Sequence, residues 1–442
     1  MCGDDSHISP KHVSREAELV IEALANGGDG VARFQGRTVF VPLALPGELV
    51  WASIPEGGTG VNAALLEVVR PSPERRPVDC PVFGECGGCQ WLHASAEVQC
   101  AWKRERVRRL FAQALGGECP EIPQVEPVPP ELHYRRRTTL HAADGALGFS
   151  AKRSHRVVTP KGCLLLDAPL EEAVQRLIDA VRSGMPLPRG CTDVSLACGD
   201  SKASAAFHFE GKLPADAMSR LSALTKRAGI AGAVACVDGQ SAGTLGKPLL
   251  SWPAPMAPGA RLFGRPELFA QAHVMAGEVL AGMAAAFIGE GERVLELFGG
   301  SGNFTLAASR RAASVTSVEI CAPALLLTRK SASEAGIENI RCVAGDAVGT
   351  AAALAAGGER FDTVLLDPPR SGAKGISQAA QAVGARRVIY VSCNPETLAK
   401  DAASLRGAGF EMELLRCFDL FPQTAHLEAV AVFRRREGGA AP

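Results

Sequence analysis

The stretch VLELFGGSGNFTL, residues 294–306, reads as a short apolar strand, a glycine-rich turn and the first turn of a helix. Gly299, Gly300 and Gly302 let the backbone turn sharply and approach a ligand closely. The turn lacks the Lys-Ser/Thr pair of a phosphate-binding loop. A second strand, SVTSVEI, carries Glu319 at its end, which is where folds of this kind hold ribose hydroxyls.

Apolar strands and helical segments alternate from about residue 266 to the end of the chain. RVLELF, SVTSVEI, IRCVAGDA, FDTVLLDPP and RRVIYVSC are the strands, and FAQAHVMAGEVLAGMAAAF (269–287) has helical periodicity ahead of them. This alternation predicts an α/β fold, with a parallel sheet covered on both faces. Asp346 ends the third strand, where it can meet a base edge. The pattern favours S-adenosylmethionine over a nucleotide phosphate as the ligand.

The fourth and fifth strands end in residues that suggest covalent chemistry. Asp367-Pro-Pro-Arg370 has an arginine where amino-group methyltransferases often place an aromatic ring. Cys393 ends the fifth strand at the same sheet edge, where a thiol is positioned for attack. A methyltransferase needs such a nucleophile when its target is a poor one, such as carbon 5 of a pyrimidine. Glu428 is a candidate base to remove the carbon 5 proton, and His426 is expected on the same strand face.

Three more segments precede this α/β domain. Residues 15–72 show short alternating strands separated by glycine turns, which predicts a small β-barrel after a polar tail, residues 1–14. Residues 73–265 form a central mixed α+β segment, and 266–442 the α/β domain. The N-terminus lacks the apolar centre of a signal peptide, and no apolar run approaches the roughly 20 residues that span a bilayer. We expect a soluble, cytoplasmic monomer.

A cysteine group opens the central segment. Cys80, Cys86 and Cys89 have the spacing C-x5-C-x2-C, and a fourth ligand would be Cys163 or, as second choice, Cys100. In a reducing cytosol, clustered cysteines indicate metal binding or catalysis rather than disulfides. An all-thiolate set suits zinc or an iron–sulfur cluster, and the spacing alone leaves both open.

The charge of the chain is balanced overall but uneven locally. Lys plus Arg and Asp plus Glu are 47 each, whereas residues 101–161 hold twelve basic and six acidic residues. A basic patch on a neutral protein can still steer a polyanion. We expect three runs to contact the phosphates of such a polyanion: Lys103 to Arg109, Arg135 to Arg137, and Lys152 to Arg156.

With these motifs in order, the chain resembles the bacterial RNA uracil-5-methyltransferases, specifically their iron–sulfur-containing 23S rRNA branch. The motifs ELFGGSGNF, DPPR, SCNP and HLE match in sequence order, and the resemblance covers nearly the whole chain. It implies a class I, Rossmann-like methyltransferase domain that uses S-adenosylmethionine. It also implies an OB-like, RNA-binding TRAM barrel at residues 15–71 and a [4Fe-4S] cluster on Cys80, Cys86, Cys89 and Cys163.

The resemblance also implies roles for single residues. Cys393 would be the nucleophile and Glu428 the base, and the expected cofactor-site residues are Gln271, Phe298, Asn303, Glu319, Asp346 and Asp367. His273 stands where the family usually has Asn, which leaves the role of that position in doubt. Gly299 replaces the Cys of the family's Phe-Cys-Gly, a change that looks harmless.

Three other functions compete with methylation of 23S rRNA. The same chemistry on tRNA is the nearest, although bacterial tRNA enzymes generally lack the barrel and the cluster. Cytosine-5-methyltransferases usually carry a cysteine in or near the fourth-strand motif, and DPPR has none. An inactive RNA-binding module would lack the nucleophile or the base, and both are present. The sequence does not identify the uridine that is modified.

Overall fold

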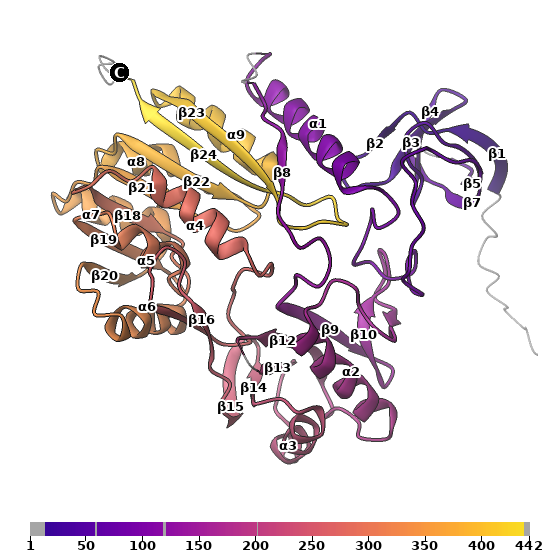
Figure 1. The fold of residues 1–442 in the computed structure, drawn as a ribbon, viewed down its shortest axis with the longest axis horizontal. Coiled ribbons are helices and arrows are strands. Elements are labelled where there is room, and N and C mark those ends of the chain that lie inside the picture. The colour runs from indigo at the N-terminus through magenta and orange to yellow at the C-terminus, as the bar shows by residue number, and fades with distance from the viewer. Residues whose placement is uncertain (1–13, 58–59, 118–120, 201, 437–442) are drawn as a thin grey trace, which may run out of the picture. The chain divides into compact units, whose positions relative to one another are not determined.

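The computed structural model describes residues 14–57, 60–117, 121–200 and 202–436 (Figure 1). Its internal contacts define two compact units. The first contains the described residues up to Asp79 together with Cys89–Trp102 and Gln423–Ala425; the second contains Cys80–Gly88, Lys103–Pro422 and the described residues from His426 onward. The predicted tail, residues 1–14, lies outside the described residues except for Ser14, which begins the first strand.

In its described residues, the first unit contains seven short strands in two sheets. One sheet has the order β1-β5-β7 and the other β2-β3-β4-β6. Their bounds are β1 Ser14–Val20, β2 Ala23–Leu24, β3 Gly30–Phe34, β4 Arg37–Val41, β5 Leu49–Pro55, β6 Gly60–Asn62 and β7 Ala64–Arg70. Val50, Ala52 and Ile54 alternate along β5 into the shared core, as the period of two in a half-buried strand requires. The predicted small all-β fold is confirmed.

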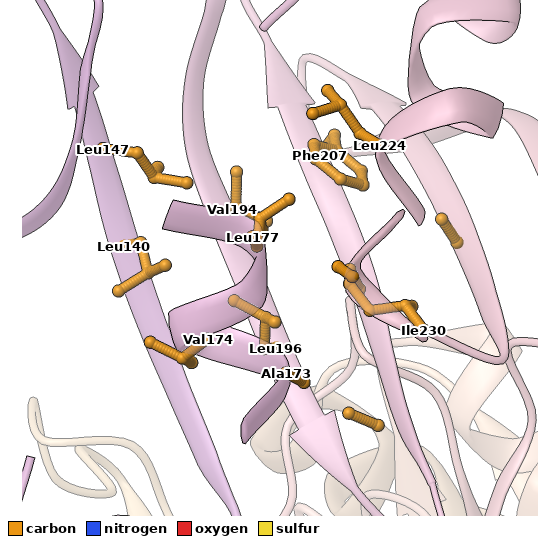
Figure 2. Close-up of a cluster of buried hydrophobic side chains, with 14 of the residues drawn as sticks. Leu140, Leu147, Ala173, Val174, Leu177, Val194, Leu196, Phe207, Leu224 and Ile230 are labelled. Carbon is orange, nitrogen blue, oxygen red and sulfur yellow. The ribbon is translucent and has the colours of Figure 1, made fainter. Parts of the chain in front are cut away.

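The central part of the second unit is a seven-stranded sheet of order β11-β10-β9-β12-β13-β14-β15. The strands are β9 Arg137–Ala143, β10 Ala146–Ser150, β11 Val157–Val158, β12 Cys191–Cys198, β13 Ala203–Phe209, β14 Gly232–Val237 and β15 Gln240–Gly246. Helices α2 (Ala168–Arg182) and α3 (Ala217–Ala228) pack on one face, where Leu177, Val194 and Phe207 share a core (Figure 2). This arrangement confirms the predicted mixed α+β fold.

The C-terminal part of the second unit is an eight-stranded sheet of order β20-β19-β18-β21-β22-β24-β23-β8. Its strands are β18 Arg293–Leu297, β19 Ser314–Glu319, β20 Ile340–Ala344, β21 Thr363–Leu366, β22 Arg387–Ser392, β23 Phe410–Asp419, β24 Glu428–Arg435 and β8 Val125–Pro127. The strands β18 to β22 are parallel, and β24 is antiparallel to both of its neighbours. The sheet that the sequence predicts is therefore present.

Helices cover this sheet because its strands are apolar on both faces. They are α4 Ala276–Ala286, α5 Asn303–Ser309, α6 Ala322–Glu334, α7 Ala347–Ala356, α8 Ile376–Ala382 and α9 Pro395–Gly407. The strand order reverses between β18 and β21, and ligands bind at such a switch point, outside the carboxyl ends of the strands. Among the described helices, none is long and apolar enough to cross a membrane.

One predicted helix is shorter than the sequence suggests. The periodic segment 269–287 becomes helical only at Ala276, and α4 ends at Ala286. The residues before it form a loop of bends and turns, in which His273 makes a β-bridge with Arg135 and its Nδ1 accepts the N–H of Met275, 3.0 Å away. Tertiary pairing here overrides the local helical pattern.

Candidate active site at the carboxyl edge of the sheet

The glycine turn after β18 is tightly packed. A Cβ atom at position 299 would lie 2.1 Å from Oγ of Ser317, so only glycine fits without movement. Gly302 has φ +95° and is the N-cap of α5, a left-handed conformation that side chains other than glycine disfavour. Phe298, at the end of the strand, also has a positive φ of 62°. The turn is thus held in a fixed conformation at the edge where ligands bind.

Several buried polar atoms around this turn lack protein partners. Within the described residues, Glu296 Oε1, Ser301 Oγ and Asn303 Nδ2 are buried and have no hydrogen-bond partner. Buried polar groups are normally paired, so unpaired ones at a ligand-binding edge fit a polar ligand that would satisfy them. Asn303, one of these residues, is also among those expected at the cofactor site.

Glu296 is a residue that the sequence analysis missed. It is 1% exposed, and burial raises the pKa of its carboxyl to about 7 despite hydrogen bonds from the hydroxyls of Thr305 and Ser317. An acidic residue inside an otherwise apolar strand could have identified this position as a candidate site residue. Burying a carboxyl costs free energy, and buried acids with a shifted pKa concentrate at functional sites.

Glu319 lies at the end of β19 and reaches back across the glycine turn. Its Oε2 accepts the N–H of Gly300 at 2.9 Å, and its Oε1 accepts that of Cys321 at 2.8 Å. The structure therefore brings Glu319 to the turn, as predicted from its place in the sequence. Asp346 instead caps α7 through a 2.7 Å bond from the N–H of Gly349, and it is exposed.

Cys393 follows β22 directly and precedes a helix. Asn394 is the N-cap of α9, with its side-chain oxygen 3.1 Å from the N–H of Glu396, and Pro395 takes the first helical position. Proline suits that position because its missing N–H would have no partner there. Asn394 Nδ2 also donates to the carbonyl of Arg370 at 2.9 Å, which ties the Cys393 loop to the DPPR loop.

Two buried carboxyls interact with the Cys393 thiol. Burial first, and then the carboxylates of Glu428 and Asp367, raise its pKa to about 11, although Arg370 acts in the opposite direction. Glu428, the first residue of β24, is 2% exposed, and burial together with Asp367 raises its pKa well above the usual range. Burial also raises the pKa of Asp367, whose Oδ2 accepts a 3.3 Å bond from Gln271. The two catalytic candidates and two cofactor-site candidates thus share one cluster.

The structure also places the two histidines that the sequence analysis singled out, His426 and His273. The prediction that His426 shares a strand face with Glu428 is wrong, because β24 begins only at Glu428. Burial and surrounding positive charges, first that of Arg370, lower the pKa of His426 to about 4, so it is neutral at pH 7. His273 stacks on Tyr134 with ring centroids 4.8 Å apart and contacts the carbonyl of Pro130, which is a packing role.

The cysteines expected to bind a cluster are divided between the two compact units. Cys80, Cys86 and Cys163 are partly buried in the second unit, whereas Cys89 and the second-choice ligand Cys100 belong to the first. Burial raises the pKa of Cys86 and of Cys163. The charge of Cys80 raises the pKa of Cys86 further in the same direction, and the charge of Cys86 does the same for Cys163. In the part of the chain that the structure describes, no three His, Cys, Asp or Glu side chains are arranged to hold a metal ion.

The expectation that Lys103 contacts RNA is also wrong. Lys103 lies on α1 (Ala96–Ala114), and its side chain is 0% exposed. Its Nζ is 2.6 Å from Oδ1 of Asp419, which is 3% exposed. Such a pair is internal to the fold, and removing one partner would leave a buried, uncompensated charge. Two other basic residues of the same run, Arg108 and Arg109, remain half exposed beside Glu105.

The chain is similar in sequence to known RNA methyltransferases. Residues 269–436 match the family model described as tRNA (Uracil-5-)-methyltransferase, and residues 10–57 match that of the TRAM domain. The 23S rRNA (uracil(1939)-C(5))-methyltransferase RlmD of Pseudomonas putida is 34% identical over 436 residues, which cover 95% of this chain and 94% of that protein. RlmD of Alkalilimnicola ehrlichii is also 34% identical, over 95% of this chain and 96% of that protein.

A solved structure shows the same fold. The tRNA (uracil-54, C5)-methyltransferase of Pyrococcus abyssi, in complex with S-adenosyl-L-homocysteine, has a TM-score of 0.73 at 21% identity and covers 94% of this chain and 100% of that chain. The expected Rossmann-like methyltransferase fold with an N-terminal TRAM domain is thereby confirmed. The chain is 34% identical to RlmD of Pseudomonas putida over 95% of its own length. It therefore belongs to the family of the RNA uracil-C5-methyltransferases, alongside the 23S rRNA enzymes of the RlmD type.

Proposed function

We propose that this protein methylates carbon 5 of a uridine in 23S rRNA, with S-adenosylmethionine as methyl donor and a covalent Cys393–uracil intermediate. The observation that carries the proposal is the buried cluster of Cys393, Glu428 and Asp367 at the carboxyl edge of the sheet. A thiol and a buried carboxyl are the two groups that methylation of this carbon requires. The near full-length identity to 23S rRNA enzymes supports the choice of substrate.

Each group has a defined task in the reaction. The Cys393 thiolate adds to carbon 6, and the electrons of the C5=C6 bond move onto O4 as an enolate. S-adenosylmethionine supplies the methyl group to carbon 5 as its sulfur–methyl bond breaks, leaving neutral S-adenosylhomocysteine. The Glu428 carboxylate then takes the carbon 5 proton, the C5=C6 bond re-forms and the carbon–sulfur bond breaks. Cys393 returns as a thiolate, and the proton remains on Glu428.

The cofactor would lie over the glycine turn. Phe298 and Asn303 flank the turn, Glu319 would accept hydrogen bonds from ribose hydroxyls, and Asp346 would meet the base edge. Gln271 and Asp367, already bonded to each other, lie on the side toward Cys393. The unpaired buried atoms of Glu296 and Asn303 support a polar ligand at this place.

The function is tested by mapping 5-methyluridine in RNA. Purified protein is incubated with radiolabelled methyl donor and either protein-free 23S rRNA or bulk tRNA from a strain that lacks this gene. We expect label in 23S rRNA, at carbon 5 of one uridine by mass mapping. Label in tRNA alone would favour the alternative, the same chemistry on tRNA, which the description of the matching family model makes the nearest rival.

Replacing Glu319 with alanine should weaken cofactor binding. Hydrogen bonds to a charged group contribute about 1.5–3 kcal/mol, so Glu319→Ala should raise the Kd for S-adenosylhomocysteine by about ten- to a hundredfold. Isothermal calorimetry measures this directly. Glu338→Ala, in the loop between α6 and β20, is the matched control and should leave the affinity unchanged. An unaltered Kd in Glu319→Ala would contradict the assignment.

The central segment would hold a [4Fe-4S] cluster on Cys80, Cys86, Cys89 and Cys163. The C-x5-C-x2-C spacing supports this, as does the N–H of Gly88, 3.4 Å from the Cys86 sulfur, because metal-bound thiolates accept such bonds. A bound metal would also offset the high pKa of the buried thiols. The cluster would serve structure or RNA binding, since methyl transfer requires no electrons.

Iron and sulfide analysis tests the cluster. Protein purified without oxygen should be brown and contain about four iron and four sulfide per chain. Cys163→Ser should lose most of both, while Cys191→Ser, a partly buried thiol on β12, should retain them. Stoichiometric zinc without sulfide would contradict the assignment.

A further inference from the structure

The connection between β23 and β24 leads directly to Glu428 and is shared by both units. Asp419 ends β23 and Glu428 begins β24. Pro422 and His426 belong to the second unit, whereas Gln423–Ala425 between them belong to the first. The chain segment that leads to Glu428 therefore packs within the N-terminal unit as far as Ala425, three residues before Glu428.

Gln423 is firmly held within the first unit. Its N–H donates to Oε1 of Gln99 at 2.8 Å, and its carbonyl accepts the N–H groups of Gln90 at 2.9 Å and Trp91 at 3.0 Å. Its side-chain oxygen accepts from Gln99 Nε2 at 2.9 Å and from Arg76 at 3.2 Å. The residue is 0% exposed. Every group that it bonds comes from the N-terminal unit.

The conformation of Gln423 needs these bonds. Its φ is +72°, a left-handed conformation that is unfavourable for a residue with a side chain. Such strain persists only where surrounding contacts impose it, and it concentrates at functional sites. Two residues later, Ala425 packs against Leu24 and Trp91, which fixes the end of the same tripeptide.

Helix α1 holds the connection at two points. Gln99 also donates to the carbonyls of Trp91 at 3.1 Å and Ala94 at 3.0 Å, so its amide is fully used. One turn further along the helix, Lys103 binds Asp419 and donates to the carbonyl of Phe421 at 3.2 Å. Residues four apart share a helix face. The same face of α1 thus holds the beginning and the middle of the connection.

One oxygen of the Glu428 carboxyl is not fixed by a hydrogen bond from any described residue. Within the described residues, its buried Oε2 has no hydrogen-bond partner. The strand ladder pairs Glu428 with Phe418 and holds the backbone on the C-terminal side. On the N-terminal side the backbone direction is set by the connection. A base must be placed within hydrogen-bond reach of its proton, so this direction matters for proton removal.

We propose that Gln99 and Gln423 are positioning residues for Glu428, acting through the chain segment that leads from Gln423 to the base. The inference rests on the proposed function, in which Glu428 takes the carbon 5 proton. It gives Gln99 and Gln423, which belong to no catalytic motif, a part in proton removal. Loss of the Gln99 contacts should slow proton removal and leave the earlier steps, nucleophilic addition and methyl transfer, largely intact.

The experiment follows the fate of the covalent intermediate. Full-length Gln99→Ala is mixed with 23S rRNA and labelled methyl donor, and methylated RNA–protein adduct is separated from free product by denaturing electrophoresis. We expect release of product to slow by about ten- to a hundredfold and adduct to accumulate, with the KM for RNA within about twofold, because small misplacements of a catalytic group have effects of this size. Gln113→Ala, an exposed glutamine on the same helix, is the matched control and should behave as wild type.

A second pair of variants separates alignment from loss of folding. Gln423→Gly and Gln423→Ala lose the same side-chain bonds and keep the backbone bonds, but only glycine adopts a φ of +72° without strain. We expect Gln423→Gly to release product several times faster than Gln423→Ala. Equal rates for the pair, or lost activity in Gln99→Ala without adduct, would overturn the inference. Failure of Glu428→Gln itself to form a methylated adduct would instead refute the proposed function, and the inference with it.

Discussion

Cys393→Ala is expected to bind RNA and cofactor with unchanged affinity and to form no product and no covalent complex. The thiol supplies the first bond to the substrate, and removing a catalytic nucleophile typically reduces the rate by about 10⁴-fold or more. The side chain is small and half-buried, so its loss should leave the fold intact. Transfer of labelled methyl groups to 23S rRNA measures the rate, and filter binding measures RNA affinity.

The surroundings of Cys393 also predict a pH dependence. Burial and the carboxylates of Glu428 and Asp367 raise the pKa of the thiol to about 11. Only about one thiol in 10⁴ is then ionised at pH 7 in the free enzyme, and the thiolate is the nucleophile. Because ionisation increases with pH below this pKa, alkylation of Cys393 by iodoacetamide should accelerate about tenfold per pH unit between pH 7 and 9.

Two comparisons make the Cys393 prediction specific. Cys342→Ala, a partly buried thiol on β20, should methylate at the wild-type rate. Cys393→Ser keeps a hydroxyl at the same place, but a neutral hydroxyl is a far weaker nucleophile, so it should be as inactive as the alanine variant. Methylation by Cys393→Ala above a few per cent of wild type would overturn the assignment of the nucleophile.

The sequence predicts the catalytic sheet well because each of its signals is local. A glycine turn after an apolar strand, acids at strand ends and a thiol before a proline all lie within a few residues of the strand that carries them. Parallel strands then bring these ends to one edge by topology alone. Cys393, Asp367 and Glu319 could therefore be placed before the structure was known.

The features that the sequence did not predict depend on contacts between distant segments. Gln99 and Gln423 are 324 residues apart, and neither belongs to a motif. Lys103 looks like any basic residue of a solvated helix until Asp419 is found 2.6 Å away. The helical pattern of 269–287 ignores the pairing of His273 with Arg135, which delays the helix to Ala276. Periodicity and charge describe one segment and carry no information about its partner.

Glu428→Gln is expected to stop the reaction one step from its end. The amide has nearly the shape of the carboxyl but cannot take a proton from carbon 5. Addition of Cys393 and methyl transfer should proceed, and elimination should stall. The product should then be a methylated RNA covalently bound through Cys393, which survives denaturing electrophoresis and carries label from the methyl donor.

The substitution should not destabilise the protein. The pKa of Glu428 is raised well above its usual range because burial disfavours the charged form. A carboxyl with a raised folded-state pKa contributes its full stability below its unfolded-state pKa, and that contribution is lost as the pH rises toward the folded-state value. A neutral amide escapes this loss. The Tm of Glu428→Gln should therefore equal or exceed that of wild type at pH 7 and above, which separates a catalytic defect from unfolding.

The contrast between Cys393→Ala and Glu428→Gln is the sharpest test of the mechanism, because the two residues act at opposite ends of one pathway. The thiol variant should yield neither adduct nor product, and the carboxyl variant should yield adduct without free product. The double variant should behave as Cys393→Ala, since a step that never begins cannot stall. Normal turnover by Glu428→Gln would remove this carboxyl from the mechanism. Asp367, the other buried carboxyl that interacts with the thiol, would then become the candidate for the base.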